Sequence, residues 1–262
     1  MQSLARAFTM LEIVAEFGVK SGTESGGGIG LSHLATHMGL APSTVHRLLN
    51  SMGEMGYVEC DPDTGLWSVG LKAFTVGNAY LKKRDFVSQA RPFMKRLVAE
   101  LGETVNMAIL DRQNVVFIAQ WECDEVMRMA VPVGTRGPLH ASAVGKALLS
   151  AMNDDDVRAI LKEIQFEPLT EKTHITIKSL MAELQQVRKR GYAIDEQEQT
   201  LGMRCIAASI YNEYAEGIAA ISISGPTVRL TRKDMARAGR AVRNMAAEIT
   251  RAIGGKETEK RE

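Results

Sequence analysis

The chain of 262 residues has few cysteines and no long hydrophobic run, and both absences exclude classes of protein. Its three cysteines, Cys60, Cys123 and Cys205, are far apart and form no C-x-x-C pair. This distribution argues against a disulfide framework and a zinc ribbon and fits reduced thiols. No apolar run approaches the roughly 18 residues that a membrane span needs, and the first residues lack the regions of a signal peptide. We therefore expect a cytoplasmic protein without a membrane partner.

An excess of positive charge is also missing. The formal net charge is +1, and residues 1–84 hold seven Lys or Arg against seven Asp or Glu. Charge alone therefore does not indicate a nucleic-acid partner. If DNA is the partner, the basic residues must gather on one face, and two copies of the chain would help. The length and the 45% hydrophobic content fit one large or two modest globular domains.

Two short helices joined by a turn are predicted near the start. Residues 4–17 carry apolar side chains at helical spacing, which predicts a first helix. Ser32 can cap a second helix that Gly39 ends, and Pro42 suits the first turn of a third helix running to about Gly53. This succession is typical of a helix-turn-helix.

A hairpin and a connecting helix are predicted next. GYVEC and LWSVG are expected to be strands on either side of the turn DPDTG, which makes the unit a winged helix-turn-helix. LKAFTVGNAYLKKR is expected to be a linker helix, and SGTESGGGIG a flexible loop before the second helix.

From Asp85 onward the sequence pattern predicts short strands alternating with helices. Strands are predicted in VNMAIL, NVVFIAQWE, VMRMAVPVG, YAIDEQE, CIAASIYN and IAAISISGP. Helices are predicted in VSQARPFMKRLVAEL, KALLSAM, NDDDVRAIL, KSLMAELQQVRKRG and DMARAGRAVRNMAAEITRAIG. We expect one mostly antiparallel sheet of five or six strands with helices around it, a GAF-like sensor architecture. The predicted α+β chain has a winged helix-turn-helix at 1–70, a linker helix at 71–84, an effector domain at 85–254 and a charged tail at 255–262.

The third predicted helix has the distribution of a DNA-reading helix. On a helical wheel its apolar residues point inward, and its polar residues point outward or to the flanks, namely Ser43, Thr44, His46, Arg47 and Asn50. Arg can grip guanine O6 and N7, and Ser or Thr can contact phosphate or a base edge. An ordinary amphipathic helix with a polar outer face has the same pattern, so the wheel alone does not decide.

Several enzymatic and metal motifs fail on their spacing. His33 and His37 lie at i,i+4, but no third zinc ligand is nearby. GPLHASAVGKALLS matches neither the spacing of a phosphate loop nor the G-x-S-x-G of a nucleophile elbow. His140, Ser222 and Asp195 remain a constellation that a hydrolase would have to assemble in space. We expect no catalytic residue, no metal and no cofactor.

The same stretch fits the N-terminus of a helix. Small residues at Ser142, Ala143 and Val144 leave backbone N–H groups open, and the helix dipole there favours an anion. Close packing of the helix on a sheet is the alternative reason for small residues. His140 and Lys146 rank lowest in this stretch as candidates for chemistry.

Four side chains on predicted strands are candidate ligand contacts. Ser222 and Ser224 share one face of an apolar strand, Asp195 ends a strand, and Cys205 begins the next one. The hydroxyls can equally bond to neighbouring backbone, and a lone buried Cys is usually a small hydrophobe.

The motifs together resemble one known family. LAPSTVHRLLNSMGEMGYVECDPDTGLWSVG resembles the winged helix of IclR-type bacterial transcription regulators, and VPVGTRGPLHASAVGKALL, RGYAIDEQEQTLGMRCIAASI and AAISISGP resemble their effector domain. The resemblance implies a homodimer or tetramer on an imperfectly palindromic DNA operator, a small-molecule effector and a regulator that can meet RNA polymerase. The wing turn lacks the basic residues of many relatives, which leaves Lys72, Lys82, Lys83 and Arg84 as secondary phosphate contacts.

The effector segments resemble the glyoxylate-responsive branch of the family, which includes the allantoin-utilisation repressor. The resemblance implies an effector pocket lined by Ser142, Ala143, Val144, Asp195, Cys205, Ser222 and Ser224. Separately from the resemblance, we expect Met107 and apolar neighbours to close the rest of the cavity. Asp195 would repel a bare anion, so it either accepts a hydrogen bond from the hydrated aldehyde or is itself protonated. One alternative is a larger effector such as an aromatic acid, and another is an enzyme built on the sensor-like domain.

Overall fold

The computed structural model describes residues 2–20, 27–82 and 85–257, which form two compact units, Met1–Asp85 and Phe86–Glu262. Most of the predicted loop (21–26), the basic Lys83 and Arg84, the side chain of Lys82 and the end of the tail (258–262) lie outside the described residues. The predicted domain limits stay a prediction.

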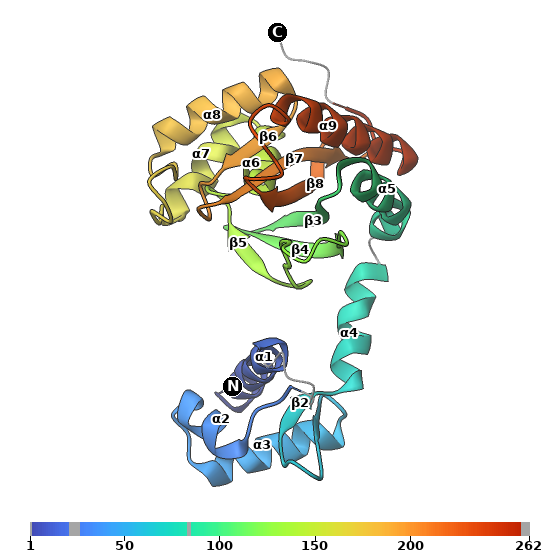
Figure 1. Cartoon of the computed structure of the whole chain (residues 1–262). Coiled ribbons are helices and arrows are strands. Elements are labelled where there is room, and N and C mark those ends of the chain that lie inside the picture. Colours follow the sequence, from blue (N-terminus) through green and yellow to red (C-terminus); the bar gives the residue numbers. More distant parts are fainter. Residues whose placement is uncertain (1, 21–26, 83–84, 258–262) are drawn as a thin grey trace. The chain divides into compact units, whose positions relative to one another are not determined.

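The first unit is a winged helix-turn-helix followed by a single helix, as predicted (Figure 1). Its elements are α1 (Gln2–Lys20), α2 (Leu31–Met38), α3 (Pro42–Glu54), β1 (Val58–Cys60), β2 (Trp67–Val69) and α4 (Leu71–Lys82). Apolar residues from α1, α2, α3 and the wing share one core, among them Met10, Leu34, Val45, Leu49 and Trp67. That core fixes how α3 is presented.

The start of α2 differs from the prediction. Gly30, not Ser32, is the N-cap, and no side chain caps the helix. The reason is that Ile29 exchanges two backbone hydrogen bonds with Trp67 (2.9 and 3.0 Å), so the chain turns into the helix directly after this bridge. Gly39 ends α2 in the left-handed conformation (φ 61°), as predicted.

The second unit is built on one antiparallel sheet of six strands in the order β5-β4-β3-β8-β7-β6. The strands are β3 (Thr104–Asp111), β4 (Asn114–Trp121), β5 (Arg136–Pro138), β6 (Ala193–Glu196), β7 (Met203–Tyr211) and β8 (Gly217–Pro226). The helices are α5 (Asp85–Leu101), α6 (Ala143–Ser150), α7 (Asp154–Glu163), α8 (Ile177–Arg190) and α9 (Met235–Ala252). The predicted sheet of five or six strands is confirmed.

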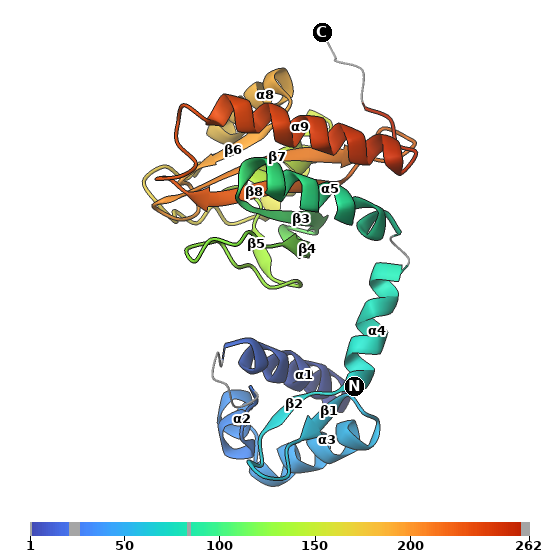
Figure 2. The same cartoon turned by 45° about the vertical axis from the view of Figure 1, so that its right-hand side comes forward.

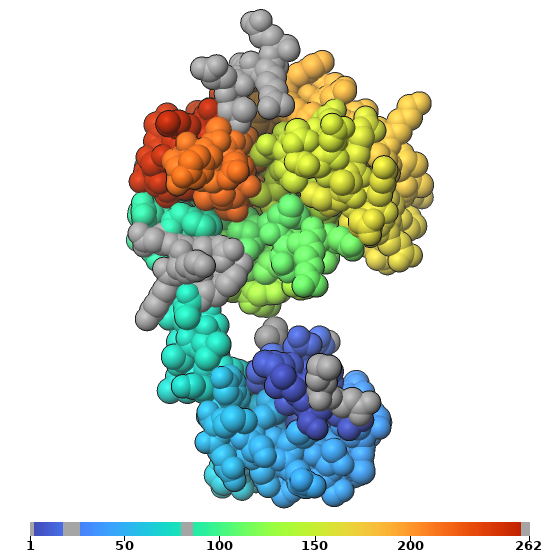
Figure 3. Space-filling model, turned by 180° about the vertical axis from the view of Figure 1, so that it is seen from behind, coloured from blue at the N-terminus to red at the C-terminus, as the bar shows by residue number. Residues whose placement is uncertain are grey.

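Helices cover both faces of this sheet. In Figures 1 and 2, α5 and α9 lie side by side over one face, and α6, α7 and α8 lie over the other. The yellow and amber surfaces of α7 and α8 form the outside of that second layer (Figure 3). We call the sheet face beneath α6 the sensor face; it shares a core with α6 through Ala108, Cys205, Ala207 and Ala220.

Strand register shows which side chains point to the sensor face. Directly paired residues of antiparallel strands lie on the same face, and neighbours along a strand alternate. Met107 pairs with Ile221, whereas its neighbour Ala108 belongs to the core beneath α6. Met107 therefore lies on the opposite face, and the expectation that it closes the effector cavity is wrong.

The strand predicted at VMRMAVPVG is also wrong. Residues 126–134 are irregular, and the short β5 after them pairs with β4 instead. Pro132 has no N–H to give a sheet, and the apolar side chains of Val126 and Met127 are exposed. Arg128 folds back to pair with Glu122 (2.6 Å) and holds the segment as a loop.

Candidate functional site

The exposed face of α3 carries the polar residues that the sequence singled out. Ser43, His46, Arg47 and Asn50 are exposed and Thr44 is half-buried, while the opposite side of α3 packs into the core. Within the described residues no ion pair holds Arg47, so its guanidinium is free for a partner. The face therefore offers a cation, an amide and hydroxyls together, the donor set that base edges and phosphates accept.

The wing contributes negative charge. The carboxylate of Asp61 accepts backbone hydrogen bonds from Asp63 (2.8 Å) and Thr64 (2.9 Å), which close the turn. The Thr64 and Asp63 N–H groups hold the pKa of Asp61 below its usual value. An ionised wing turn does not favour a phosphate backbone, so α3 stands as the stronger candidate for DNA contact.

The rejected zinc pair on α2 is a ring cluster. The rings of His33 and His37 lie 4.8 Å apart, and each lies about 5 Å from Phe17 of α1. No group of three metal-ligating side chains is found in the described part of the chain. The two histidines contribute to the packing of α2 on α1.

The start of α6 is a capped and deeply buried helix N-terminus. Ser142 is the N-cap, and its hydroxyl accepts from Gly145 N (3.1 Å) and donates to Pro138 O (2.7 Å). A side chain at Gly145 would clash with the carbonyl of Leu139, so glycine allows the preceding segment to lie against the first helical turn. The backbone N–H groups of Ala143 and Val144 belong to the first turn and have no partner within α6.

The predicted strand residues come together on the sensor face. In register, Asp195 of β6 pairs with Cys205 of β7, and Cys205 pairs with Ser224 of β8. Ser222 lies one pleat away, and all four side chains are buried. Because α6 packs on β6, β7 and β8, this row lies beneath the helix that carries Ser142, Ala143 and Val144.

The carboxyl group of Asp195 is almost completely buried. It is 2% exposed, and its Oδ1 accepts from Glu198 N (2.6 Å) and Gln199 N (3.4 Å). Burial raises the pKa of Asp195 to about 7, against the opposing effect of the Glu198 N–H. Near neutral pH the group therefore exists in both forms, so it can donate or accept a hydrogen bond.

Cys205 behaves as a neutral thiol. Burial, followed by the charge of Asp195, raises its pKa above the ordinary value for cysteine. The thiol is hydrogen-bonded to Ser224, which opposes that shift. A thiol held in this state is a poor nucleophile, which suits a packing or binding role.

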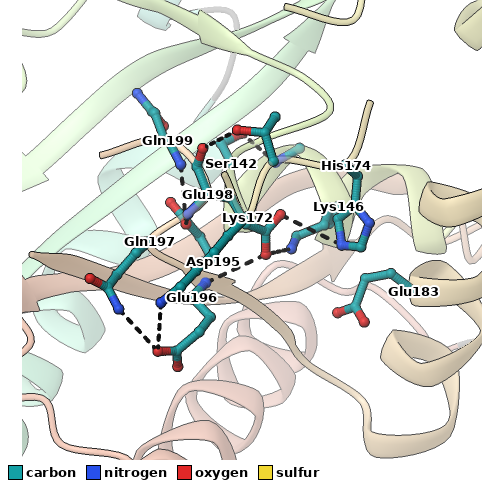
Figure 4. Close-up of polar contacts among 12 residues, drawn as sticks. Ser142, Lys146, Lys172, His174, Glu183, Asp195, Glu196, Gln197, Glu198 and Gln199 are labelled. Atoms are coloured by element: carbon teal, nitrogen blue, oxygen red, sulfur yellow. Dashed lines mark hydrogen bonds and ion pairs between the residues drawn. The ribbon is translucent and has the colours of Figure 1, made fainter. Parts of the chain in front are cut away.

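A buried ion pair that the sequence reading missed lies beside this row. Lys146 of α6 has no exposed surface, and its ammonium is paired with Glu198, whose other oxygen, Oε2, lacks a hydrogen-bond partner among the described residues (Figure 4). The low rank of Lys146 as a candidate for chemistry stays a prediction, but its charge lies near Asp195 and lowers the pKa of that group.

Two threonines of the turn at residues 170–173 form hydrogen bonds with the loop that follows β6. Thr173 donates to Glu198 O (2.6 Å), and Thr170 donates to Gln197 O (2.8 Å). His174 lies 3.8 Å from Glu198 Oε2, and burial lowers its pKa against the opposing charge of Glu198. We call these hydrogen bonds from Thr170 and Thr173 the threonine clasp.

The hydrolase constellation is not assembled. His140 Nε2 lies 3.0 Å from Glu167 O, and its ring packs on Phe166. Within the described residues it makes no hydrogen bond to Ser222 or Asp195. The arrangement as a whole is a buried polar cluster, with backbone N–H groups that have no partner within α6, two serine hydroxyls and one carboxyl group. Backbone N–H groups at a helix N-terminus together with hydroxyls are donors that can bind a small anion.

Comparison with known proteins is consistent across the chain. The profile of the IclR helix-turn-helix domain matches residues 3–62, and that of the bacterial transcriptional regulator IclR C-terminal domain matches residues 78–251. No helix in the described ranges is long and apolar enough to cross a membrane.

Individual relatives match along nearly the full length. The transcriptional repressor IclR of Escherichia coli K12 is 40% identical over 97% of this chain and 91% of that protein. The HTH-type transcriptional repressor AllR of the same strain is 38% identical over 97% and 90%, respectively. The crystal structure of the Thermotoga maritima IclR superposes with a TM-score of 0.80 at 25% identity, covering 97% of this chain and 99% of that one.

Proposed function

The chain belongs to the IclR family of bacterial transcriptional regulators, and from this premise we propose that glyoxylate or a similar small 2-oxo acid controls its hold on DNA. It is a ligand-responsive DNA-binding regulator, and its relatives are regulators rather than enzymes. The single observation that carries the proposed effector is the row Asp195–Cys205–Ser224 beneath the buried start of α6.

We assign DNA reading to α3. Arg47 binds a guanine edge, and Asn50, Ser43, Thr44 and His46 contact neighbouring bases or phosphates. The support is their shared exposure on a helix whose other side is fixed in the core. In a two-fold dimer, paired helices meet half-sites about one helical turn apart, which requires an imperfectly palindromic operator.

We expect Arg47→Ala to abolish operator binding while fold and effector affinity stay unchanged. The assay is a gel shift on a DNA fragment that the wild-type protein selects from a random pool. Arg6→Ala, which removes the same charge from the exposed side of α1, is the matched control. Normal retention of the fragment by Arg47→Ala would overturn the assignment.

The effector's carboxylate is assigned to the first amides of α6 and the serine hydroxyls. The backbone N–H groups of Ser142, Ala143 and Val144 bind the negative charge of the carboxylate. Ser222 and Ser224 donate hydrogen bonds to the carboxylate oxygens. Cys205 and Asp195 line the opposite side of the effector. The burial of the row at 8% exposure or less favours a small molecule over an aromatic acid. A calorimetric titration with glyoxylate, pyruvate, glycolate and 4-hydroxybenzoate tests this order; tightest binding of the aromatic acid would reverse it.

We propose a homodimer or tetramer built on apolar residues that the first unit leaves exposed. α1 exposes Leu4 (65%) and Phe8 (59%), and α4 exposes Leu71 (74%) and Phe74 (64%). Exposed apolar groups of this kind mark protein interfaces. Light scattering should report a dimer or larger for the wild type and a monomer for Phe74→Asp. Contact with RNA polymerase is a further proposal that the same family membership supports.

Effector and operator are then coupled thermodynamically. An effector that lowers DNA affinity by some factor must have its own affinity lowered by DNA by that same factor. Titrating glyoxylate with and without operator DNA measures both sides of this cycle.

A further inference from the structure

Asn106 on β3 carries a buried amide whose donor is unused. The side chain has no exposed surface, and its Oδ1 accepts from Gln120 Nε2 (2.8 Å). Its Nδ2 has no hydrogen-bond partner in the described part of the protein. Leaving a buried donor unpaired destabilises a protein, so an acceptor outside the chain is expected at this place.

The position of Asn106 joins it to the effector row. It pairs in register with Ser222, so both side chains lie on the sensor face, with Cβ atoms about 5 Å apart. No hydrogen bond occupies the Ser222 hydroxyl among the described residues either. Two adjacent donors on one buried face, both lacking a protein acceptor, form a place for oxygen atoms of a ligand.

We propose that Asn106 is a specificity-determining residue, whose Nδ2 donates a hydrogen bond to the oxygen on carbon 2 of a small 2-oxo acid. The inference rests on the proposed function, because the carboxylate of the same molecule is met by the start of α6, which packs on β3 as well as β7 and β8. A neutral amide suits this second oxygen, since the ligand's charge is already met by backbone donors.

The chemistry predicts discrimination between two acids that each have two carbons and one carboxylate. Glyoxylate has an oxygen on carbon 2 and acetate has none, so only glyoxylate satisfies the Asn106 amide. A site built to pair a polar group rejects the analogue that leaves the group unpaired. Removing the amide should therefore lower the affinity for glyoxylate and leave the affinity for acetate unchanged.

The matched control lies on the same strand and face. Thr104 is two residues away and equally buried, but its hydroxyl already accepts from Cys123 N (3.4 Å) and contacts Cys123 Sγ (3.5 Å). Thr104→Val removes a partnered hydroxyl, whereas Asn106→Leu removes an unpartnered donor. Gln120 is only half-buried, so water can replace the lost Asn106 oxygen as its acceptor.

The experiment is calorimetric titration of full-length wild type, Asn106→Leu and Thr104→Val with glyoxylate and with acetate. We expect Asn106→Leu to bind glyoxylate at least about fivefold more weakly, with acetate affinity unchanged within twofold and Thr104→Val like wild type for both. Equal glyoxylate affinity in wild type and Asn106→Leu overturns the inference alone, and the missing acceptor is then an ordered water. A wild type that binds neither acid overturns the proposed effector and this inference together.

If Asn106→Leu does not fold, a spectroscopic measurement on the wild-type protein tests the same contact. The side-chain amide signal of Asn106 is identified in ¹⁵N spectra by its loss in Asn106→Ser. In the wild type it should shift on addition of glyoxylate and stay in place on addition of acetate. An amide signal that both acids leave unmoved contradicts the contact.

Discussion

Effector affinity should fall as pH rises, because Asp195 titrates near neutrality. Burial raises the pKa of Asp195 to about 7, and its Oδ1 is occupied by two backbone N–H groups. Its second oxygen can therefore carry the proton and donate it to an anionic effector. An ionised Asp195 would repel the same anion, and the repulsion would be strong because this buried carboxylate is little screened by water.

The size of the effect follows from the fraction of Asp195 that is protonated. With a pKa of about 7, roughly nine-tenths of the molecules carry the proton at pH 6 and roughly one-tenth at pH 8. If only the protonated form binds, affinity for glyoxylate falls about tenfold between these values, and binding near pH 7 takes up about half a proton. Calorimetry in two buffers of different ionisation heat measures both quantities.

A matched variant separates the contribution of Asp195 to the pH dependence from that of other titratable groups. Asp195→Asn keeps the backbone hydrogen bonds and a donor but cannot titrate, so its affinity should not change with pH. The pKa of His174 is lowered, and its titration remains in the variant, so a slope that survives there belongs to another group. A wild-type affinity that rises with pH would refute the reasoning, because Asp195 would then act ionised, as acceptor for the hydrated aldehyde.

Three further predictions concern stability. Lys146→Met should cost about 3–5 kcal/mol in urea unfolding, since Glu198 is left buried without its counter-charge; Lys146→Met with Glu198→Gln should recover most of it, and no recovery would contradict the pairing. Gly145→Ala should cost about 1–3 kcal/mol, because the new side chain meets the Leu139 carbonyl, and a neutral result would show that this segment yields freely. Asp195→Asn should stabilise the ligand-free protein: the raised native pKa penalises the wild type fully above pH 7, and the gain should vanish towards pH 4, as thermal unfolding across pH can check.

The first unit could be predicted closely because its signals are local. Gly39 in the left-handed turn and Pro42 at the start of α3 act through their own backbone preferences, which sequence states directly. The predicted N-cap of α2 was wrong because the start of this helix depends on a contact that is not local in the sequence. A backbone bridge between Ile29 and Trp67, far apart in the chain, decides where that helix begins.

The polar centre of the second unit could be predicted only in part. Alternation along β8 placed Ser222 and Ser224 on one face, as observed. Lys146 and Glu198 are 52 residues apart, and no local spacing links them. One signal was available: a lysine inside the otherwise small and apolar run AVGKALL has no solvent to reach and needs a buried counter-charge.

The threonine clasp has a consequence for response time. A molecule held beneath α6, among side chains that are at most 8% exposed, cannot leave until some cover moves. The hydrogen bonds from Thr170 and Thr173 hold Gln197 and Glu198, in the loop that directly follows β6 and Asp195. Arrival and departure then follow the opening rate of the loop, on a scale of microseconds or longer, rather than diffusion. If the proposed effector binds there, the clasp would set how long the regulator retains a signal after the effector has disappeared from solution.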